Sequence, residues 1–194
     1  MQPSWKQHND QFSKIKLPAS APLCQAFEHV EQRDNDFYAA DLGCGSGIDT
    51  LAMLEKGWKV LAIDKDEASL ENLKTTKSAL LETQLQSFEK LNLPQLDLIN
   101  ASMSLPFCDP LHFNACWQSI RLSLKTQGFF CGHFFGPKDS WSSRPGMTFL
   151  TKAQLNALLK GFEILWMDEK EKEGKTLSGM IKNWHVFSVL ARKS

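Results

Sequence analysis

The strongest constraint on the fold of this chain is a glycine-rich segment that separates a short apolar run from an amphipathic one. Residues 39–47 read AADLGCGSG, with glycine at the alternate positions Gly43, Gly45 and Gly47. Glycines at this spacing let the backbone approach a ligand where a side chain would collide. A helix expected over about Ile48–Lys56 would add free N–H groups and a partial positive charge. The segment therefore predicts a nucleotide-like ligand at the carboxyl end of a parallel sheet.

Two carboxylates near this turn separate the cofactors that it could bind. A dinucleotide-binding turn has the spacing G-x-G-x-x-G, whereas this chain has G-x-G-x-G with Asp41 two residues before the first glycine. A carboxylate there would repel a pyrophosphate and attract an ammonium group, such as that of the methionine part of S-adenosylmethionine. Asp64 closes the next strand, where an acidic side chain can accept hydrogen bonds from ribose hydroxyls. A helix-capping or surface role is the alternative for Asp64, because it begins the charged run DKDE.

The remaining segments alternate between strand-like and helix-like patterns, which indicates a layered α/β domain with a mainly parallel sheet. Strands are expected at Phe37–Leu42, Lys59–Asp64, Gln84–Phe88, Leu96–Ala101, Gly128–Phe135, Phe162–Met167 and Trp184–Ala191. Helices are expected at Leu23–Gln32, Ile48–Lys56, within residues 66–77, after the Asp109-Pro110 start and after the capping box of Thr151 and Gln154. The run DEKEKEGK between the last two strands is typical of a solvated hairpin loop.

The composition is that of one soluble domain. The 194 residues suit a single domain over 1–194, with a polar arm or lid at 1–21 and a Rossmann-like core at 22–194. Lys plus Arg and Asp plus Glu number 22 each, which gives no global reason to expect nucleic acid or an anionic membrane as a partner. The five cysteines form no C-x-x-C pair, and neither a signal peptide nor a spanning apolar run is visible. We therefore expect a cytoplasmic protein with reduced thiols, and no metal site.

The sequence resembles a known family over most of Asp36–Lys193. AADLGCGSGIDTLAML and KGWKVLAIDKDEAS resemble the first motif and the segment after it in class I S-adenosylmethionine-dependent methyltransferases. FEKLNLP, DLINASMSLPF, GFFCGHFFGPKDSWSSRPGMTFLT and KNWHVFSVLARK resemble small bacterial members, including tellurite-resistance-like methyltransferases. The resemblance implies a Rossmann-like three-layer sandwich with a seven-stranded, mainly parallel sheet in the order 3-2-1-4-5-7-6, of which strand 7 is antiparallel. It also implies S-adenosyl-L-methionine as cofactor and S-adenosyl-L-homocysteine as product.

The resemblance also assigns cofactor-binding positions. Those expected around the methionine moiety are Asp41, Gly43, Cys44, Gly45 and Gly47. Those expected at the ribose, the adenine and the sulfonium are Asp64, Lys65, Ser87, Phe88, Asn100 and Ala101. Many relatives have an acidic residue where Ser87 stands, and serine is a weaker acceptor than a carboxylate. Either Glu89 helps to bind the adenine amino group, or packing and backbone groups hold the ring.

The acceptor side is less well defined by the sequence. His133, at the end of the fifth expected strand, is a candidate base, and the alternative is a structural histidine within an aromatic layer. Ser102, Trp141 and Arg144 are candidate substrate contacts, and Trp141 could form an apolar lid with aromatic residues of the amino-terminal arm. Soft nucleophiles that arrive ionised need no strong base.

We therefore expect a methyltransferase that acts on a small molecule, with thiols and metalloids among the acceptors. A cofactor-binding but non-catalytic module that acts through protein contacts is the alternative. An NAD-dependent oxidoreductase is a third hypothesis, against which the glycine spacing and Asp41 count. The N-A-S sequence at Asn100 differs from the N-P-P-Y pattern of enzymes that methylate nucleic acid bases, which disfavours nucleic acid as substrate. Methylation of protein or RNA stays open, because a single sequence does not reveal a local basic patch.

Overall fold

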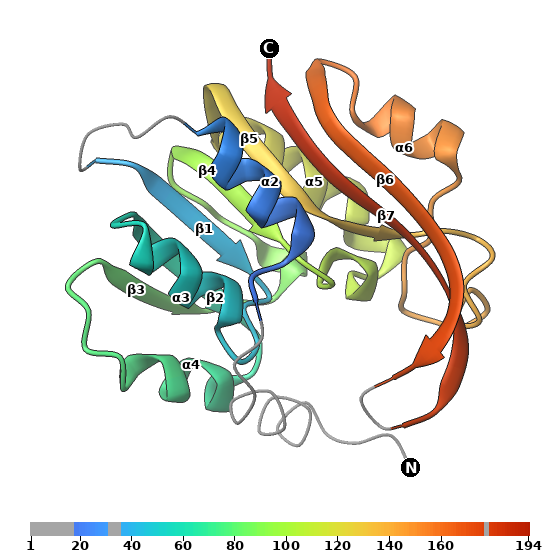
Figure 1. Cartoon of the computed structure of the whole chain (residues 1–194), viewed down its shortest axis with the longest axis horizontal. Coiled ribbons are helices and arrows are strands. Elements are labelled where there is room, and N and C mark those ends of the chain that lie inside the picture. Colours follow the sequence, from blue (N-terminus) through green and yellow to red (C-terminus); the bar gives the residue numbers. More distant parts are fainter. Residues whose placement is uncertain (1–17, 31–35, 177–178) are drawn as a thin grey trace.

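One seven-stranded sheet organises the part of the chain that this computed structural model describes, namely residues 18–30, 36–176 and 179–194. Its strands are β1 (Tyr38–Leu42), β2 (Lys59–Asp64), β3 (Leu81–Leu85), β4 (Leu96–Ala101), β5 (Leu124–Phe135), β6 (Phe162–Lys175) and β7 (Ile181–Lys193). Its helices are α2 (Ala21–His29), α3 (Ile48–Glu55), α4 (Glu67–Lys74), α5 (Pro110–Ser123) and α6 (Lys152–Leu158), with short 3-10 turns η1 (Phe88–Lys90) and η2 (Leu105–Phe107). Figure 1 shows the helices on both sides of the sheet.

The strand order is β3-β2-β1-β4-β5-β7-β6. The pairs among β1 to β5 are parallel, and β7 runs antiparallel to both β5 and β6. The predicted order and the antiparallel seventh strand are confirmed. Because β1, β2 and β4 are parallel neighbours, their carboxyl ends meet at one edge of the sheet, where a ligand site is expected.

Two apolar cores make the molecule a three-layer sandwich, as predicted. The face of the sheet that carries Ala39 packs against α2 and α3, and the face that carries Ala40 packs against α5 and α6. Helix α4 adds a smaller cluster, in which Leu73 packs with Ala62 of β2. Alternate residues of one buried strand therefore supply both cores, as in parallel sheets that are covered on both faces.

The predicted helix starts agree with the structure. The Asp109 carboxylate accepts a hydrogen bond from the Leu111 N–H at 2.8 Å and caps α5. Thr151 and Gln154 form the reciprocal capping box of α6. Among the described residues, no helix is long and apolar enough to cross a membrane.

The predicted loop at DEKEKEGK is wrong. Strand β6 continues through this run to Lys175, which pairs with Ile181 of β7. The backbone of β6 therefore finds its partners in β7, while most of the charged side chains are exposed because β6 is the edge of the sheet. Alternating charges on an edge strand keep it from pairing with other chains, and the same letters are typical of a loop.

Other boundaries also shift. The third strand is β3 (Leu81–Leu85) rather than Gln84–Phe88, and Phe88 begins η1. This strand is the other edge of the sheet and is largely half-buried or exposed, so its apolar pattern is weak. Strand β5 begins at Leu124 rather than Gly128. The predicted arm or lid at 1–21, including Trp5 and Phe12, lies mostly outside the described residues, and the domain division stays a prediction.

Candidate cofactor pocket

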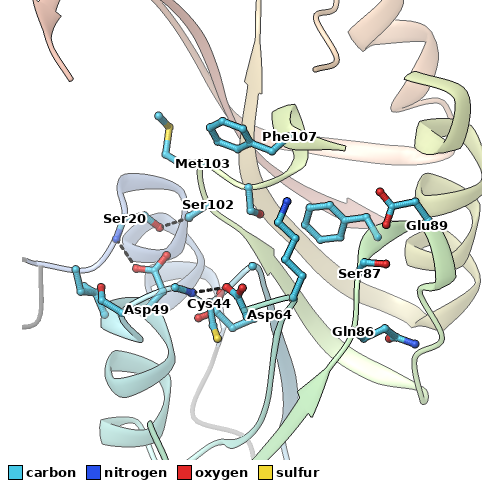
Figure 2. Close-up of a pocket in the computed structure, with 18 of the residues that line it drawn as sticks. Ser20, Cys44, Asp49, Asp64, Gln86, Ser87, Glu89, Ser102, Met103 and Phe107 are labelled. Carbon is cyan, nitrogen blue, oxygen red and sulfur yellow. Dashed lines mark hydrogen bonds between the residues drawn. The ribbon is translucent and has the colours of Figure 1, made fainter. Parts of the chain in front are cut away.

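A pocket of about 290 Å³ opens at the carboxyl ends of β1, β2 and β4. Figure 2 shows its side chains, which come from the glycine turn, from the segment after β3 and from the turn after β4. The lining residues are Pro18, Ser20, Asp41, Gly43, Cys44, Gly45, Ser46, Ile48, Asp49, Asp64, Lys65, Gln86, Ser87, Phe88, Glu89, Ser102, Met103, Ser104 and Phe107. Most of the predicted cofactor residues are therefore gathered at one cavity.

The glycine turn has the conformation that its sequence predicts. Gly43, Gly45 and Gly47 all have positive φ, at 68°, 51° and 82°. A Cβ on Gly43 would lie 2.6 Å from the Ser104 Cβ, so only glycine lets this turn pass the segment after β4. Gly47 caps α3 and is absent from the lining residues. A Cβ on Gly47 would point toward Leu73 of α4 rather than into the pocket. The role of Gly47 is to let two helices approach each other.

The Asp64 carboxylate is fixed by the backbone around it. One oxygen accepts a hydrogen bond from the Gly45 N–H at 2.9 Å, and the other accepts one from the Asp66 N–H at 2.9 Å. The side chain that caps α4 is that of Asp66, which accepts from the Ala68 N–H. A carboxylate oxygen can accept more than one hydrogen bond, so Asp64 keeps acceptor capacity toward the pocket.

A buried network of two carboxylates and one amide forms the floor of the pocket. The Asn100 Nδ2 donates to Asp41 at 2.8 Å and to Asp49 at 2.9 Å. The Thr50 hydroxyl also donates to Asp41, at 2.6 Å. Asn100 is fully buried and uses both of its N–H bonds on the carboxylates, so it holds them together rather than lining the cavity.

The segment before α2 closes one side of this network. The Ser20 N–H donates to Asp49 at 2.8 Å, and Ser20 Oγ lies 2.6 Å from the Ser102 Oγ (Figure 2). Ser20, Asp49 and Phe107 line the pocket but are not among the site residues that the sequence predicts. Asp49 carried a signal, since it is an acidic residue in the first turn of the helix that follows the glycine turn. Ser20 carried none, because its partners are distant in sequence.

The network perturbs the titration of Asp41. Burial and the neighbouring Asp49 raise the pKa of Asp41 to about 7, although hydrogen bonds from Thr50 and Asn100 oppose this shift. The charge of this carboxylate therefore changes near neutral pH. A cationic ligand would favour its ionised form.

The raised pKa of Asp41 predicts a pH dependence of stability. A carboxyl group whose pKa is raised by folding stabilises the fold fully below its unfolded pKa, and this contribution is lost as pH rises through the folded value. We therefore expect the melting temperature of the ligand-free protein to fall between pH 5 and pH 8, because pH then rises through the folded pKa of Asp41. Thermal denaturation of the wild type and of Asp41→Asn measures this fall. An equal fall in the variant would contradict the assignment.

Ser87, which departs from the family pattern, lines the end of the pocket where the adenine is expected. A hydrogen bond with the Ser87 side chain is the largest influence on Glu89 and lowers its pKa. Glu89 lines the pocket together with Ser87 and Phe88. A carboxylate is thus present at this end even though position 87 is a serine. The Glu89 alternative from the sequence therefore has a geometric basis.

The hydroxyl group of Ser104 indicates that the pocket suits a polar ligand. Its Oγ is buried and has no hydrogen-bond partner among the residues that the structure describes, and the residue lines the pocket beside Gly43. Buried hydroxyl groups normally have a partner. The chemistry of the pocket, with acidic groups at the glycine turn and beyond β2, fits a ligand that has a cationic end and a sugar. S-adenosylmethionine has both.

Several predicted site residues lie behind the lining. Asn100 and Ala101 are fully buried and are absent from the lining. Cys44 does line the pocket, but burial raises the pKa of its thiol well above its usual range. His133 is also absent from the lining. Its Nδ1 accepts a hydrogen bond from the Met103 N–H at 3.3 Å, and burial lowers its pKa to about 4. The imidazole is therefore neutral near pH 7.

Trp141 and Arg144 belong to a cluster beside the pocket. The Arg144 guanidinium lies over the Trp141 ring at 4.3 Å. The Lys182 ammonium lies 3.8 Å from the centre of the same ring and forms a buried ion pair with Asp139. Trp141 is absent from the lining, and its ring lies 6.4 Å from that of the lining residue Phe107, measured between the ring centres. The predicted substrate contact at these two residues stays a prediction.

The fold is of the Rossmann-like type, and the glycine turn with its acidic neighbours lies at the edge of the sheet where such folds bind their ligand. Residues 39–128 match the family described as methyltransferase domain, which confirms the predicted resemblance to class I S-adenosylmethionine-dependent methyltransferases. No curated protein sequence matches the chain. In the described parts of the chain, no three His, Cys, Asp or Glu side chains are grouped so that they could hold a metal ion.

Solved structures of similar fold come from bacteria and archaea. TehB from Haemophilus influenzae has a TM-score of 0.77 and 18% identity, over 90% of this chain and 62% of its own, so this chain spans less than two thirds of TehB. A SAM-dependent methyltransferase from Methanosarcina mazei has a TM-score of 0.68 and 19% identity, over 91% and 99%.

A third neighbour was solved with ligands bound. The 1,6-didemethyltoxoflavin-N1-methyltransferase of Burkholderia thailandensis has a TM-score of 0.64 and 19% identity, over 90% and 79% of the two chains. Its structure contains 1,6-didemethyltoxoflavin and S-adenosylhomocysteine. At these identities the likeness shows the fold. The predicted cofactor is the one on which the Methanosarcina mazei methyltransferase depends, and its product is bound in the Burkholderia thailandensis structure. The narrower tellurite-resistance-like type stays a prediction.

Proposed function

We propose that this protein transfers a methyl group from S-adenosylmethionine to a small-molecule acceptor. The proposal depends on one observation. The glycine turn, the backbone-fixed Asp64 and the network of Asp41, Asn100 and Asp49 meet at a single pocket. This arrangement supplies the acidic groups that an amino acid end and a ribose require, on a backbone that a ligand can approach closely.

The lining residues suggest how the cofactor would be held. The glycine turn and the acidic floor would take its methionine end, Asp64 its ribose, and Phe88 with Glu89 its adenine. When bound, the cofactor supplies a methyl group on a sulfonium, which is a good leaving group. The protein then has to orient the acceptor and exclude water.

The remaining lining residues suggest the chemistry of the acceptor. Ser20, Ser102, Met103 and Phe107 lie on the side of the pocket away from the adenine end (Figure 2). The lining contains one basic side chain among the described residues, Lys65, which follows the ribose-binding Asp64. A neutral or soft nucleophile such as a thiol suits these surroundings. The small-molecule ligand of the Burkholderia neighbour supports the same class.

The cellular setting is also a proposal. All five cysteines are free, which agrees with a reducing compartment such as the cytoplasm. The net charge of zero favours a small molecule over nucleic acid as the partner.

Calorimetric titration with S-adenosylhomocysteine, followed by transfer of labelled methyl to an acceptor panel, tests the proposal. The panel contains benzenethiol, hydrosulfide, selenite, tellurite and imidazole. We expect binding of one equivalent and methylation of at least one acceptor. Binding without transfer would support the non-catalytic alternative. Stabilisation by NADH in place of S-adenosylhomocysteine would support the oxidoreductase hypothesis.

A further inference from the structure

Met103 has an unusual backbone conformation at the edge of the pocket. It lies in the turn after β4, its φ is 53°, and it lines the cavity. The left-handed conformation is unfavourable for a residue with a side chain, so neighbouring structure must hold Met103 there. Non-glycine residues in such conformations cluster at functional sites.

His133 supplies the group that holds this turn. Its Nδ1 accepts the Met103 N–H at 3.3 Å, and its side chain is only 9% exposed. The preceding residue, Gly132, pairs with Ala101 of β4, and a Cβ at Gly132 would lie 2.6 Å from the Ala101 oxygen. The absence of that Cβ lets β5 pass close to the end of β4, which brings the imidazole within reach of Met103.

This hydrogen bond determines which nitrogen of the neutral His133 imidazole carries the hydrogen. A neutral histidine has one N–H and one accepting nitrogen. Because Nδ1 accepts from Met103, the hydrogen must be on Nε2. The accepting nitrogen is therefore already occupied, and it faces a backbone amide rather than an acceptor molecule.

The turn presents a thioether to the end of the pocket that the proposed cofactor position leaves for the acceptor. Figure 2 shows Met103 beside Phe107, away from Ser87 and Gln86. Met103 is 38% exposed, so its side chain is available for contact. Thioethers are polarisable and pack well against sulfur and aromatic groups.

We propose that Met103 is a specificity-determining residue that contacts the acceptor, a soft thiol-like or aromatic nucleophile, and that His133 is a positioning residue that holds Met103 in its left-handed conformation. This inference rests on the proposed function, because the acceptor end is defined by where the cofactor lies. It assigns His133 a role other than the general base that the sequence predicts.

Two substitutions at His133 separate its hydrogen bond from its bulk. Asparagine places an accepting oxygen near the position of Nδ1, whereas leucine fills the space without an acceptor. With benzenethiol as the probe, His133→Leu is expected to raise KM by about 2- to 12-fold, the equivalent of one net hydrogen bond. His133→Asn should stay close to the wild type, and both should keep the wild-type affinity for S-adenosylhomocysteine. Met103→Ala should reproduce the increase in KM.

Methyl NMR gives a readout that needs no turnover. In protein with ¹³C-labelled methionine methyl groups, the Met103 signal of the S-adenosylhomocysteine complex should move in His133→Leu and stay in place in His133→Asn. An unchanged Met103 signal in His133→Leu, or an equal displacement in both variants, would overturn the inference. Failure of the wild type to bind S-adenosylhomocysteine would instead refute the proposed function.

Discussion

Replacing Asp64 with alanine should weaken the binding of S-adenosylhomocysteine by about 10- to 100-fold, as measured by isothermal titration calorimetry. Two effects contribute to this loss. The substitution removes the proposed acceptor for the ribose hydroxyls, and it also removes the group that accepts the Gly45 N–H at 2.9 Å. The glycine turn would then lose one of its anchors as well.

Asp66→Ala is the matched control for this prediction. Asp66 is the next carboxylate in the same segment, two residues after Asp64; it caps α4 and is absent from the pocket lining. Its removal should cost about 1 kcal/mol of stability and leave cofactor affinity close to the wild-type value. Equal affinities of the wild type and Asp64→Ala would remove Asp64 from the site.

Replacing Asn100 with leucine should destabilise the fold by about 3–5 kcal/mol, in the range found when a buried polar network loses a partner. Leucine has a similar volume but no donor. Asp41 and Asp49 would then face each other with no amide between them. Urea denaturation at pH 8, above the raised pKa of Asp41, measures the loss.

Two further variants separate this effect from ordinary packing. Ser102→Ala removes a hydroxyl that lies 3.1 Å from the Asn100 Oδ1 but contacts neither carboxylate, and should cost about 1 kcal/mol or less. Asp49→Asn combined with Asn100→Leu should recover part of the stability, since one charge is removed. If the Asn100→Leu protein loses less stability than the Ser102→Ala protein, the network does not stabilise the fold.

Local sequence patterns predicted the central architecture correctly. Strand β4 was predicted without error at Leu96–Ala101, and the capping residues Asp109 and Thr151 mark real helix starts. Such signals involve only neighbouring residues, so they can be recognised in a single chain. The full strand order came from the resemblance to a family.

The wrong loop at DEKEKEGK and the displaced third strand both fall on edge strands of the sheet, and these two errors have a physical cause. The residues of β3 and β6 are half-buried or exposed, so their side chains carry little apolar pattern. Their backbone hydrogen bonds are made with β2 and β7, which the local sequence does not specify. The charged residues of β6 therefore predict a loop when the local sequence is considered alone.

The candidate site also contains a part that the local sequence predicts and a part that it does not. The glycine turn and Asp64 could be predicted because the ligand-binding pattern is contained in one stretch of sequence. The contacts of Asn100 with Asp41 and Asp49 join β4 to β1 and α3, at separations of 59 and 51 residues. His133 illustrates the limit, since its type and strand position suggest a base, while its partner is a backbone amide.

A crystal structure of the protein with S-adenosylhomocysteine tests the central claim most directly. The account predicts the ribose hydroxyls on the Asp64 carboxylate, the adenine beside Phe88 and the amino group above the floor that contains Asp41. Ligand bound elsewhere on the protein, or a pocket that stays free of ligand at saturating concentration, would contradict it.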